Sequence, residues 1–168
     1  MKILSGSLKN RVINISKNQI FRPTKSIVRK SLFDSLGAIE NKSFLDLFSG
    51  SGINSFEAFS RGSKNVSLVE IDRNAIKNLK KNILHLDSDS IQIYQRDVFR
   101  FLNRCDDYDI IFADPPYGIY DLNKLVTLSL KKLNPGGVFI LECSENESLE
   151  GYNKIAKFGG SKLLYWNK

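Results

Sequence analysis

The sequence predicts an α/β fold, with a mostly parallel sheet of seven strands covered by helices on both faces. Two observations lead to this prediction. From residue 43 onward, short apolar runs alternate with longer amphipathic stretches, which is the pattern of repeated strand–helix units. The chain has 168 residues, of which 42% are hydrophobic and 26% charged, enough for the core of one domain. We therefore expect a single domain over residues 1–168, in which residues 1–42 form a basic extension packed onto the sheet.

The N-terminal extension is expected to form a hairpin followed by a helix. Residues 2–15 carry two short apolar pairs around a polar turn, which indicates a small hairpin. After a loop, Thr24 can cap a helix that runs to about Leu36, because apolar residues recur there at helical spacing. Gly37 is a suitable residue to end this helix.

Five strands and four helices are then expected to alternate along the chain. The strands are predicted over residues 43–48, 66–70, 91–95, 108–113 and 137–143. The helices are predicted over residues 53–61, 73–85, 98–104 and 120–133. Two more short strands within residues 154–166, around Gly159 and Gly160, predict an antiparallel hairpin at one edge of the sheet.

The formal net charge of +7 lies entirely in the first quarter of the chain. Residues 1–42 hold nine Lys and Arg against two acidic residues, whereas the remaining residues hold equal numbers of each sign. A localised basic excess is typical of a surface that binds nucleic acid, although a solvated surface is the simpler alternative. The candidates for contacts with RNA phosphates are Lys9, Arg11, Arg22, Lys25, Arg29 and Lys30.

Composition argues against a membrane, disulfide or metal protein. No apolar run approaches the roughly 20 residues that a membrane span needs, and the N-terminus lacks the apolar core of a secretion signal. Cys105 and Cys143 are too few for a disulfide framework, and His85 is the single histidine. We expect a cytoplasmic protein with reduced thiols, without membrane association or metal, and monomeric by default.

A glycine loop follows the first strand of the alternating region. The chain runs from the strand through Gly50-Ser51-Gly52 into a helix, and the two glycines let the backbone turn sharply beside a ligand. Glu70 ends the next strand, 20 residues beyond Gly50, where nucleotide-binding sheets place an acidic residue on ribose hydroxyls. A tight strand–helix turn in an unrelated α/β domain is the alternative.

Acidic residues lie at the ends of four successive strands of the predicted sheet. Because the carboxyl ends of parallel strands meet at one edge, Asp46, Glu70, Asp97 and Asp114 are expected to line that edge. Only Lys42 brings a positive charge nearby, so the edge suits a cationic or zwitterionic ligand better than a pyrophosphate. S-adenosylmethionine fits, because it carries a sulfonium, an α-amino group and a ribose diol.

The expected contacts with this cofactor follow from the order of the strands. Glu70 would bind the ribose, with Ile71 against the adenine. Asp97 would take the adenine amino group, and Asp46 would face the methionine ammonium, directly or through water. The candidate cofactor residues from these strand ends are Asp46, Phe48, Ser49, Gly50, Gly52, Glu70, Ile71, Asp97, Val98 and Asp114.

The residues Asp114-Pro115-Pro116-Tyr117 follow the apolar strand 108–113. The prolines stop the strand and fix the loop, so a carboxylate, a rigid carbonyl and an aromatic face stand at one strand end. This set suits a flat nitrogenous ring with an exocyclic amino group, whose hydrogens the two oxygens accept while Tyr117 stacks on the ring. Asp114, Pro115 and Tyr117 are therefore candidate catalytic residues. A plain turn is the alternative, because Asp and Pro both favour turns.

Together these motifs resemble the class I methyltransferases that modify exocyclic amino groups of bases. The residues that carry this resemblance are the segment 46–52, Glu70-Ile71-Asp72, Asp97 and the segment 114–117. The N-terminal part is similar to the bacterial small-subunit rRNA guanine-N2 methyltransferases of the RsmD type. This narrower resemblance rests on Arg22-Pro23-Thr24, the segment 28–33, the segment 3–6 and Asn10-Arg11.

The resemblance implies a Rossmann-like class I methyltransferase that transfers a methyl group from S-adenosylmethionine to the exocyclic N2 of a guanine in 16S rRNA. The partner would be this rRNA, the small ribosomal subunit or its assembly intermediate. Asp114 and the Pro115 carbonyl would hold the guanine amino group, and Tyr117 would stack on the base. Arg22 and Thr24 would lie over the methionine end of the cofactor. The chain departs from the family at residues 53–56, where the family often has Ala or Gly.

Several other functions are compatible with the same residues. An adenine-N6 methyltransferase acting on RNA or DNA uses the same chemistry, and Asp-Pro-Pro-Tyr alone does not separate the two bases. A glutamine-N5 protein methyltransferase, a nucleic-acid-binding module with a vestigial cofactor pocket and an NAD-linked oxidoreductase are further alternatives. The sequence does not fix the target nucleotide, nor the choice between naked rRNA and an assembled particle.

Overall fold

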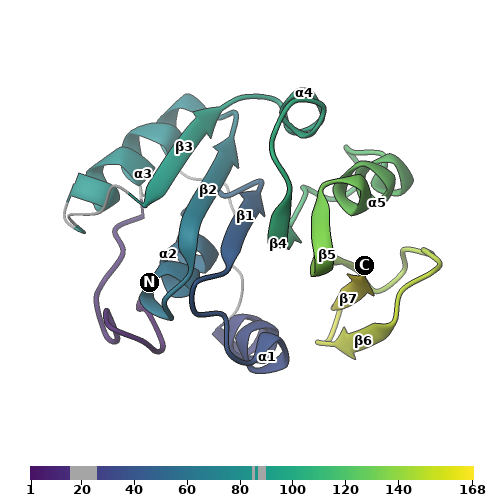
Figure 1. The fold of residues 1–168 in the computed structure, drawn as a ribbon, viewed down its shortest axis with the longest axis horizontal. Helices are drawn as coiled ribbons and strands as arrows, with labels where there is room; N and C mark the ends of the chain where they lie inside the picture. The colour runs from purple at the N-terminus through teal and green to yellow at the C-terminus, as the bar shows by residue number, and fades with distance from the viewer. Residues whose placement is uncertain (16–25, 85, 87–89) are drawn as a thin grey trace.

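The computed structural model describes residues 1–15, 26–84, 86 and 90–168, and a seven-stranded sheet forms its centre (Figure 1). The strands are β1 (Ser43–Leu47), β2 (Lys64–Glu70), β3 (Ile91–Gln95), β4 (Tyr108–Ala113), β5 (Leu133–Ser144), β6 (Lys154–Lys157) and β7 (Ser161–Asn167). They lie in the order β3-β2-β1-β4-β5-β7-β6. The strand order reverses between β1 and β4, which is the place where open α/β sheets bind their ligands.

The sheet is parallel except at its C-terminal edge. β1 pairs with β2 and β4, β2 pairs with β3, and β4 pairs with β5, all in parallel. β7 lies between β5 and β6 and runs antiparallel to both. The prediction of a mostly parallel sheet with a final antiparallel hairpin is confirmed.

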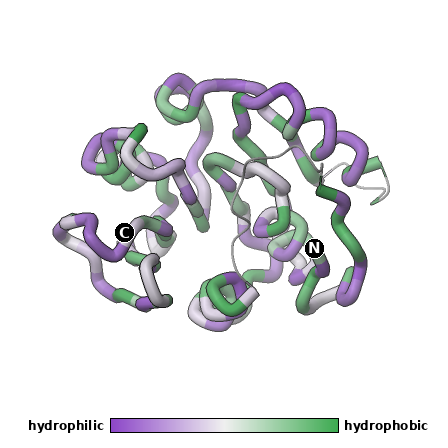
Figure 2. Tube along the Cα trace, turned by 180° about the vertical axis from the view of Figure 1, so that it is seen from behind, coloured by the Kyte–Doolittle hydropathy of each residue, from purple (hydrophilic) through white to green (hydrophobic). Residues whose placement is uncertain are grey.

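Helices cover both faces of the sheet, as predicted. One face packs against α1 (Ser26–Leu36), α2 (Ile53–Ser60) and α3 (Arg73–Leu84), and the other against α4 (Val98–Leu102) and α5 (Leu122–Lys131). Side chains of the strands alternate between the two buried clusters; in β4, Phe112 faces the first cluster and Ile111 the second. In Figure 2 the helices carry hydrophobic and hydrophilic residues in turn, as expected when one side packs on a sheet. Within the described part of the chain, every helix is too short or too polar to cross a membrane.

Several boundaries in the second half of the chain differ from the prediction by a few residues. β5 begins at Leu133, because its pairing with β4 continues past an irregularity in register. α5 begins at Leu122, because the Asp121 side chain accepts a hydrogen bond from the Lys124 amide (3.0 Å) and caps the helix. α4 ends at Leu102 and is shorter than predicted.

The N-terminal segment is paired like a hairpin but forms no strand ladder. A single antiparallel bridge joins Lys2 to Val12, and the Ile3 amide donates to the Arg11 carbonyl (3.0 Å). The predicted hairpin is therefore confirmed in its pairing, although it is too short to count as two strands. The predicted helix cap at Thr24 lies outside the described residues.

This segment runs along α2 from one end to the other. The Ser7 amide donates to the carbonyl of Ser60, the last residue of α2 (2.7 Å). At the opposite end, the hydroxyl of Ser51 in the glycine loop lies 3.8 Å from the Met1 sulfur. The polar turn of the segment is therefore at the far end of α2 from the glycine loop.

Candidate active site

The carboxyl ends of the parallel strands meet at one edge of the sheet. Leu47 of β1 lies level with Val69 of β2 and with Ala113 of β4. The glycine loop follows β1 directly, and the loop of residues 114–117 follows β4 directly. Because β1 and β4 are neighbours, the two predicted loops leave the sheet side by side.

Aromatic rings connect these two loops. The Phe48 ring, which follows β1, packs edge-on against Tyr120 with ring centres 4.6 Å apart. Tyr120 also meets Phe99 of α4 at 5.9 Å, and the Lys124 ammonium lies 4.8 Å from the centre of the Phe99 ring. The sequence predicts Phe48 at this site, but not Tyr120 or Phe99. The position of Tyr120 three residues after Tyr117 was the only sequence signal for it.

Tyr120 lies within the electrostatic reach of the acidic strand ends. Its partial burial raises the pKa of its hydroxyl, and the negative charges of Asp97 and Glu70 raise that pKa further. The hydroxyl therefore stays protonated and can donate a hydrogen bond at neutral pH. Tyr120 thus brings an aromatic face and a hydroxyl donor from the loop after β4 to Phe48 and to the acidic strand ends.

The glycine loop is closed by backbone hydrogen bonds. The Ser49 amide donates to the Val69 carbonyl (3.0 Å), and the Gly52 amide donates to the Ser49 carbonyl (2.7 Å). Gly50 and Gly52 have φ angles of 51° and 75°, in the left-handed region that favours glycine. A Cβ atom at Gly52 would also lie 2.5 Å from the Leu79 Cδ2 atom. Backbone conformation and packing thus account for glycine at position 52.

Glu70 ties this loop to the end of β2. Its Oε2 atom accepts a hydrogen bond from the Gly50 amide (2.8 Å). Its Oε1 atom accepts from the amides of Ile71 (2.7 Å) and Asp72 (2.8 Å). A carboxylate has about four lone-pair positions, so these three bonds leave one position for a ligand hydroxyl.

Asp46 lies beneath the glycine loop instead of on its surface. Its side chain is buried, and its Oδ2 atom accepts a hydrogen bond from the Ser55 hydroxyl of α2 (2.6 Å). Burial raises the pKa of Asp46 to about 7, although the hydrogen bonds from Ser55 act in the opposite direction; the charge of Glu70 adds to the rise. Asp46 therefore changes its charge near neutral pH.

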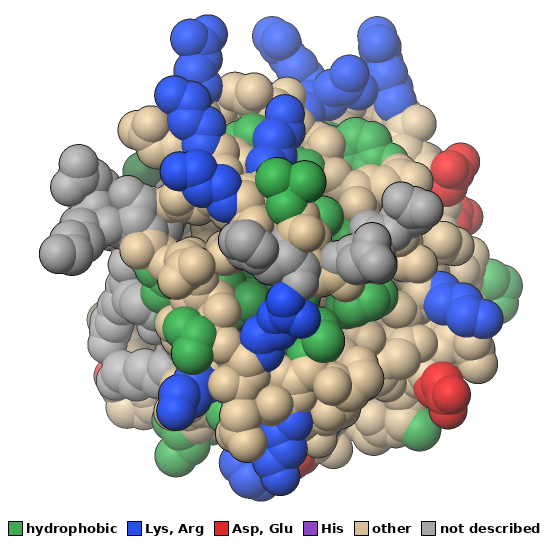
Figure 3. Space-filling view, turned by 90° about the vertical axis from the view of Figure 1, so that its left-hand side faces the viewer, with side chains coloured by type: hydrophobic (Ala, Val, Ile, Leu, Met, Phe, Trp, Pro, Cys, Tyr) green, Lys and Arg blue, Asp and Glu red, His purple; other side chains and the backbone are tan. Residues whose placement is uncertain are grey.

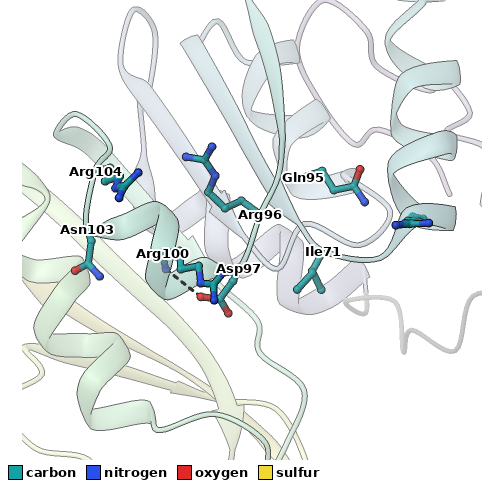
Figure 4. A pocket seen from close by; sticks show the side chains of 8 residues that line it. Ile71, Gln95, Arg96, Asp97, Arg100, Asn103 and Arg104 are labelled. Atoms are coloured by element: carbon teal, nitrogen blue, oxygen red, sulfur yellow. Dashed lines mark hydrogen bonds between the residues drawn. The ribbon is translucent and has the colours of Figure 1, made fainter.

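Ile71 and Asp97 lie together in a groove beyond the ends of β2 and β3 (Figure 4). The groove is open and has a volume of about 1140 Å³. Ile71 is 58% exposed and offers an apolar surface to a flat ring. Asp97 caps α4 by accepting a hydrogen bond from the Arg100 amide (3.0 Å). Val98 is buried and packs in the core, so its predicted contact with the cofactor would be made by its backbone.

The loop after β4 presents the predicted acceptors at the same edge. Pro115 is buried, Asp114 is half-buried and Tyr117 is 49% exposed. Ile119 is exposed and adds apolar surface two residues further on. A ring face beside a half-buried carboxylate suits a planar base that carries an amino group.

The described basic residues of the N-terminal part divide into two groups. Lys9 and Arg11 are exposed in or beside the polar turn. Lys30 is also exposed, on α1, where its ammonium lies 2.6 Å from the Asp34 carboxylate. These three remain candidates for contacts with phosphates.

Arg29, in contrast, does not lie on the surface, and the structure does not support the predicted phosphate contact. It is 2% exposed; its Nη2 atom donates to the Lys2 carbonyl (2.9 Å), and its Nε atom lies 3.8 Å from Oε2 of the buried Glu57. Burial lowers the pKa of this guanidinium, and the charge of Glu57 opposes that effect. Arg29 faces the interior because it lies on the same side of α1 as the core residues Val28 and Leu32.

Three other predicted residues lie outside the described part of the chain. They are Arg22 and Thr24, expected over the cofactor, and Lys25, expected together with Arg22 on RNA. Their roles stay predictions.

Known proteins resemble this chain over most of its length. The model of the family described as Conserved hypothetical protein 95 matches residues 1–164. This chain belongs to that family. It is 39% identical over 118 residues to the ribosomal RNA small subunit methyltransferase D of Buchnera aphidicola subsp. Acyrthosiphon pisum (strain APS). That match covers 68% of this chain and 62% of the relative.

A second relative and a solved structure are also similar to this chain. The protein of the same name in Buchnera aphidicola subsp. Baizongia pistaciae (strain Bp) is 34% identical over 134 residues, which cover 78% of this chain and 68% of that protein. The structure of a hypothetical protein from Thermus thermophilus has a TM-score of 0.88 and 27% identity, and covers 99% of this chain and 98% of that one. The predicted resemblance to RsmD-type methyltransferases and the Rossmann-like class I methyltransferase fold are confirmed.

The edge of this family member fits a positively charged nucleoside cofactor. Glu70 offers a remaining acceptor for a hydroxyl, and Ile71 offers an apolar surface for a base. Asp46 and Glu70 supply carboxylates close to the glycine loop. These carboxylate acceptors and this apolar surface therefore match the ribose diol, adenine and ammonium of S-adenosylmethionine.

Proposed function

We propose that this chain is an S-adenosylmethionine-dependent rRNA methyltransferase that modifies the exocyclic N2 of a guanine in 16S rRNA. One arrangement carries the proposal: the acidic strand ends that suit the cofactor and the Asp114–Tyr117 loop leave neighbouring strands at one edge. The choice of substrate is supported by the family, whose relatives include the two Buchnera small subunit rRNA methyltransferases.

The cofactor would be held by the ends of β1, β2 and β3. Glu70 would accept from a ribose hydroxyl, Ile71 would lie against the adenine and Asp97 would accept from its amino group. Asp46 would face the methionine ammonium from below the glycine loop, and its burial favours contact through water. S-adenosylmethionine supplies a methyl group on a sulfonium, which is a good leaving group.

The protein's task is then to present the base amino group in line with that methyl group. The amino nitrogen is a weak nucleophile, because its lone pair is conjugated with the ring. Asp114 and the Pro115 carbonyl would accept its two hydrogens and turn the lone pair toward the methyl carbon. As the methyl group is transferred, a new N–C bond would form while the C–S bond breaks and the sulfur leaves as a neutral thioether. The amino nitrogen would then lose one proton to the Asp114 carboxylate or to solvent. Positioning of this kind lowers a barrier by about 7–11 kcal/mol in favourable cases.

Recognition of the RNA would combine stacking with phosphate contacts. Tyr117 is exposed enough to stack on the base, an interaction worth about 1–3 kcal/mol. A paired guanine would first have to leave its helix. Lys9, Arg11 and Lys30 would hold phosphates and set the register without reading sequence.

Adenine-N6 methylation is the second candidate. The Asp114 carboxylate and the Pro115 carbonyl would hold the N6 amino group of adenine in the same way. Tyr117 would stack equally well, because every base has an aromatic face. The identity of the methylated nucleoside therefore decides between the two functions.

The experiment uses small ribosomal subunits and naked 16S rRNA from a bacterial strain that lacks its own enzyme of this family. Each is incubated with the protein and tritiated S-adenosylmethionine, and the nucleosides are separated, with the Asp114→Ala variant as background. N2-methylguanosine in 16S rRNA supports the proposal. N6-methyladenosine would replace it by the second candidate, and no RNA labelling despite cofactor binding would overturn it.

A further inference from the structure

We propose that the groove beyond β2 and β3 binds RNA phosphates through Arg73, Arg96, Arg100 and Arg104. The proposal rests on the proposed rRNA substrate and names a surface that would carry the RNA past the cofactor edge. It adds a site to the predicted basic N-terminal extension, because all four arginines lie outside residues 1–42.

The four arginines reach this groove from different elements of the fold. Arg73 begins α3, Arg96 follows β3, Arg100 lies in α4 and Arg104 lies just beyond it. All four are exposed. Figure 4 shows Ile71 toward one end of the groove and Arg104 toward the other. The positive charge therefore extends along the groove instead of being confined to one point.

Little negative charge opposes these arginines. Of the described residues that line the groove, only Asp97 is acidic, and it already accepts the Arg100 backbone amide. Among the described residues, none of the four guanidinium groups lies within ion-pair distance of a carboxylate. Four guanidinium groups without such partners form a site for an anion, because arginine binds phosphate in a bidentate way.

The cofactor does not explain these arginines. S-adenosylmethionine carries no phosphate, and its one anionic group, the methionine carboxylate, is at the opposite end of the molecule from the adenine that Ile71 and Asp97 are expected to hold. The chain would thus keep four like charges beside a cationic ligand, at an electrostatic cost, unless an anion also comes to this place. RNA is the anion that the proposed reaction brings.

The extent of the basic surface favours a polymer over a free nucleotide. Three exposed lysines of α3, namely Lys77, Lys80 and Lys81, continue the positive charge beyond Arg73. Figure 3 views the molecule from the side of α3 and shows Lys and Arg side chains along the upper rim, with few Asp or Glu. A positively charged groove of this kind follows a nucleic-acid backbone over several nucleotides.

The groove is also closer to the expected cofactor site than the N-terminal turn. Ile71 and Asp97, the predicted neighbours of the adenine, line the same groove. The turn that carries Lys9 packs beside Ser60, at the far end of α2 from the glycine loop. RNA held by the arginines would therefore lie over the adenine end of the cofactor site.

The experiment compares two triple variants of the full chain. One is Arg96→Gln, Arg100→Gln and Arg104→Gln, and the matched control is Lys64→Gln, Lys131→Gln and Lys157→Gln. The control removes the same charge from exposed positions away from the groove. Binding of a fluorescent single-stranded RNA of about 20 nucleotides is measured by anisotropy over a series of salt concentrations. Calorimetry with S-adenosylmethionine and circular dichroism verify cofactor binding and fold.

We expect the arginine variant to bind this RNA at least about tenfold more weakly than the wild type at about 100 mM salt. The slope of log affinity against log salt concentration should become smaller by about 2, because each of the three lost contacts with a single strand contributes about 0.7. Its cofactor affinity should stay within about twofold of the wild type, as Ile71 and Asp97 are retained. An arginine variant that binds RNA like the control would overturn the proposal. The proposal would also be overturned if the arginines bind ATP but their substitution leaves the affinity for RNA unchanged.

These outcomes are distinct from a failure of the proposed function. Wild-type protein that binds RNA through the arginines but labels no guanine would contradict the guanine-N2 reaction and keep the groove. Wild-type protein that methylates guanine while the arginine variant has an unchanged KM for small subunits would contradict the groove and keep the reaction. The single variant Arg104→Glu repeats the test if the triple variant folds poorly.

Discussion

The backbone amide of Gly50 donates a hydrogen bond of 2.8 Å to the carboxylate of Glu70, which joins the glycine loop after β1 to the end of β2. The same carboxylate also accepts the amides of Ile71 and Asp72. Glu70 thus holds together the backbone at the carboxyl ends of β1 and β2, independently of any ligand. Its structural and binding contributions can be measured separately.

Glu70→Gln should weaken both the fold and cofactor binding. The substitution replaces one acceptor oxygen by an NH₂ group that meets a backbone donor, and a lost bond of this type costs about 1–3 kcal/mol. We expect a lower melting temperature and about tenfold weaker binding of S-adenosylmethionine, because the ribose also loses its charged acceptor. Thermal unfolding and calorimetry measure the two effects, with the exposed Glu145→Gln as control. Unchanged cofactor affinity would remove Glu70 from the binding site.

Gly52→Ala should destabilise the protein more than Gly136→Ala. Both glycines have φ of 75°, so each substitution places alanine in the same unfavourable conformation. Only at Gly52 would the new Cβ meet other atoms, 2.5 Å from Leu79 and 2.8 Å from Phe56, whereas nothing lies within 4 Å at Gly136. Overpacking of this kind costs about 1–3 kcal/mol. Denaturant unfolding gives the difference, and equal losses at the two positions would show that the clash relaxes.

The fold, and the edge of the sheet on which the candidate site lies, could be predicted from the sequence, because hydrophobic periodicity fixes the order of strands and helices. Parallel strands with helical connections then have to place their carboxyl ends together. This is why Asp46, Glu70 and Asp114 could be assigned to one edge from strand ends alone. The glycine spacing at Gly50 and Gly52 located the turn within that edge.

Features that depend on packing could not be predicted in this way. The burial of Arg29 depends on which side of α1 faces the sheet, and on the buried carboxylate of Glu57 that lies opposite. The contact of Tyr120 with Phe48 depends on the path of the loop after β4. The arginine groove brings together residues of α3, of the loop after β3 and of α4, which are separate segments of the sequence. Tertiary structure, not local sequence, brings them together.

Asp46→Asn should remove a pH dependence of stability. The pKa of Asp46 rises from 3.8 to about 7 on folding, so between these pH values the folded protein holds a proton that the unfolded chain has lost. The stability that this group contributes is complete below about pH 4 and is lost as the pH rises toward 7. Asparagine imitates the protonated acid at every pH. The melting temperature of the variant should therefore rise relative to the wild type as the pH increases.

Melting curves at a series of pH values across this range measure the effect, and the exposed Asp106→Asn is the control. A constant difference between wild type and Asp46→Asn at all pH values would contradict a raised pKa. The same variant tests cofactor binding, because a neutral amide attracts the methionine ammonium less than a carboxylate does. We expect S-adenosylmethionine to bind the wild type more tightly as the pH rises from about 6 to about 7, and the variant to lack this gain.

Asp114→Ala should abolish methyl transfer while cofactor binding survives. The carboxylate is one of the two expected acceptors that orient the base amino group, and loss of such an oriented contact costs about 100-fold or more in rate. Single-turnover methylation of small subunits measures the rate, and calorimetry measures the cofactor. The exposed Asp106→Ala should leave both unchanged. A variant of Asp114 that keeps most of its turnover would refute the assigned role.

Lys9→Gln combined with Arg11→Gln should weaken RNA binding and reduce its salt dependence. Both side chains are exposed in or beside the turn that packs against the end of α2, and two lost contacts with single-stranded RNA lower the salt slope by about 1.4. Because this turn and the arginine groove lie on different parts of the structure, the effects of the two variants should multiply when they are combined. Anisotropy titrations with the wild type, each variant and their combination measure this. If the salt slope of the double variant is unchanged, the arginine groove is the main contact with RNA. If the combined variant loses no more RNA affinity than either variant alone, both sites hold the same phosphates.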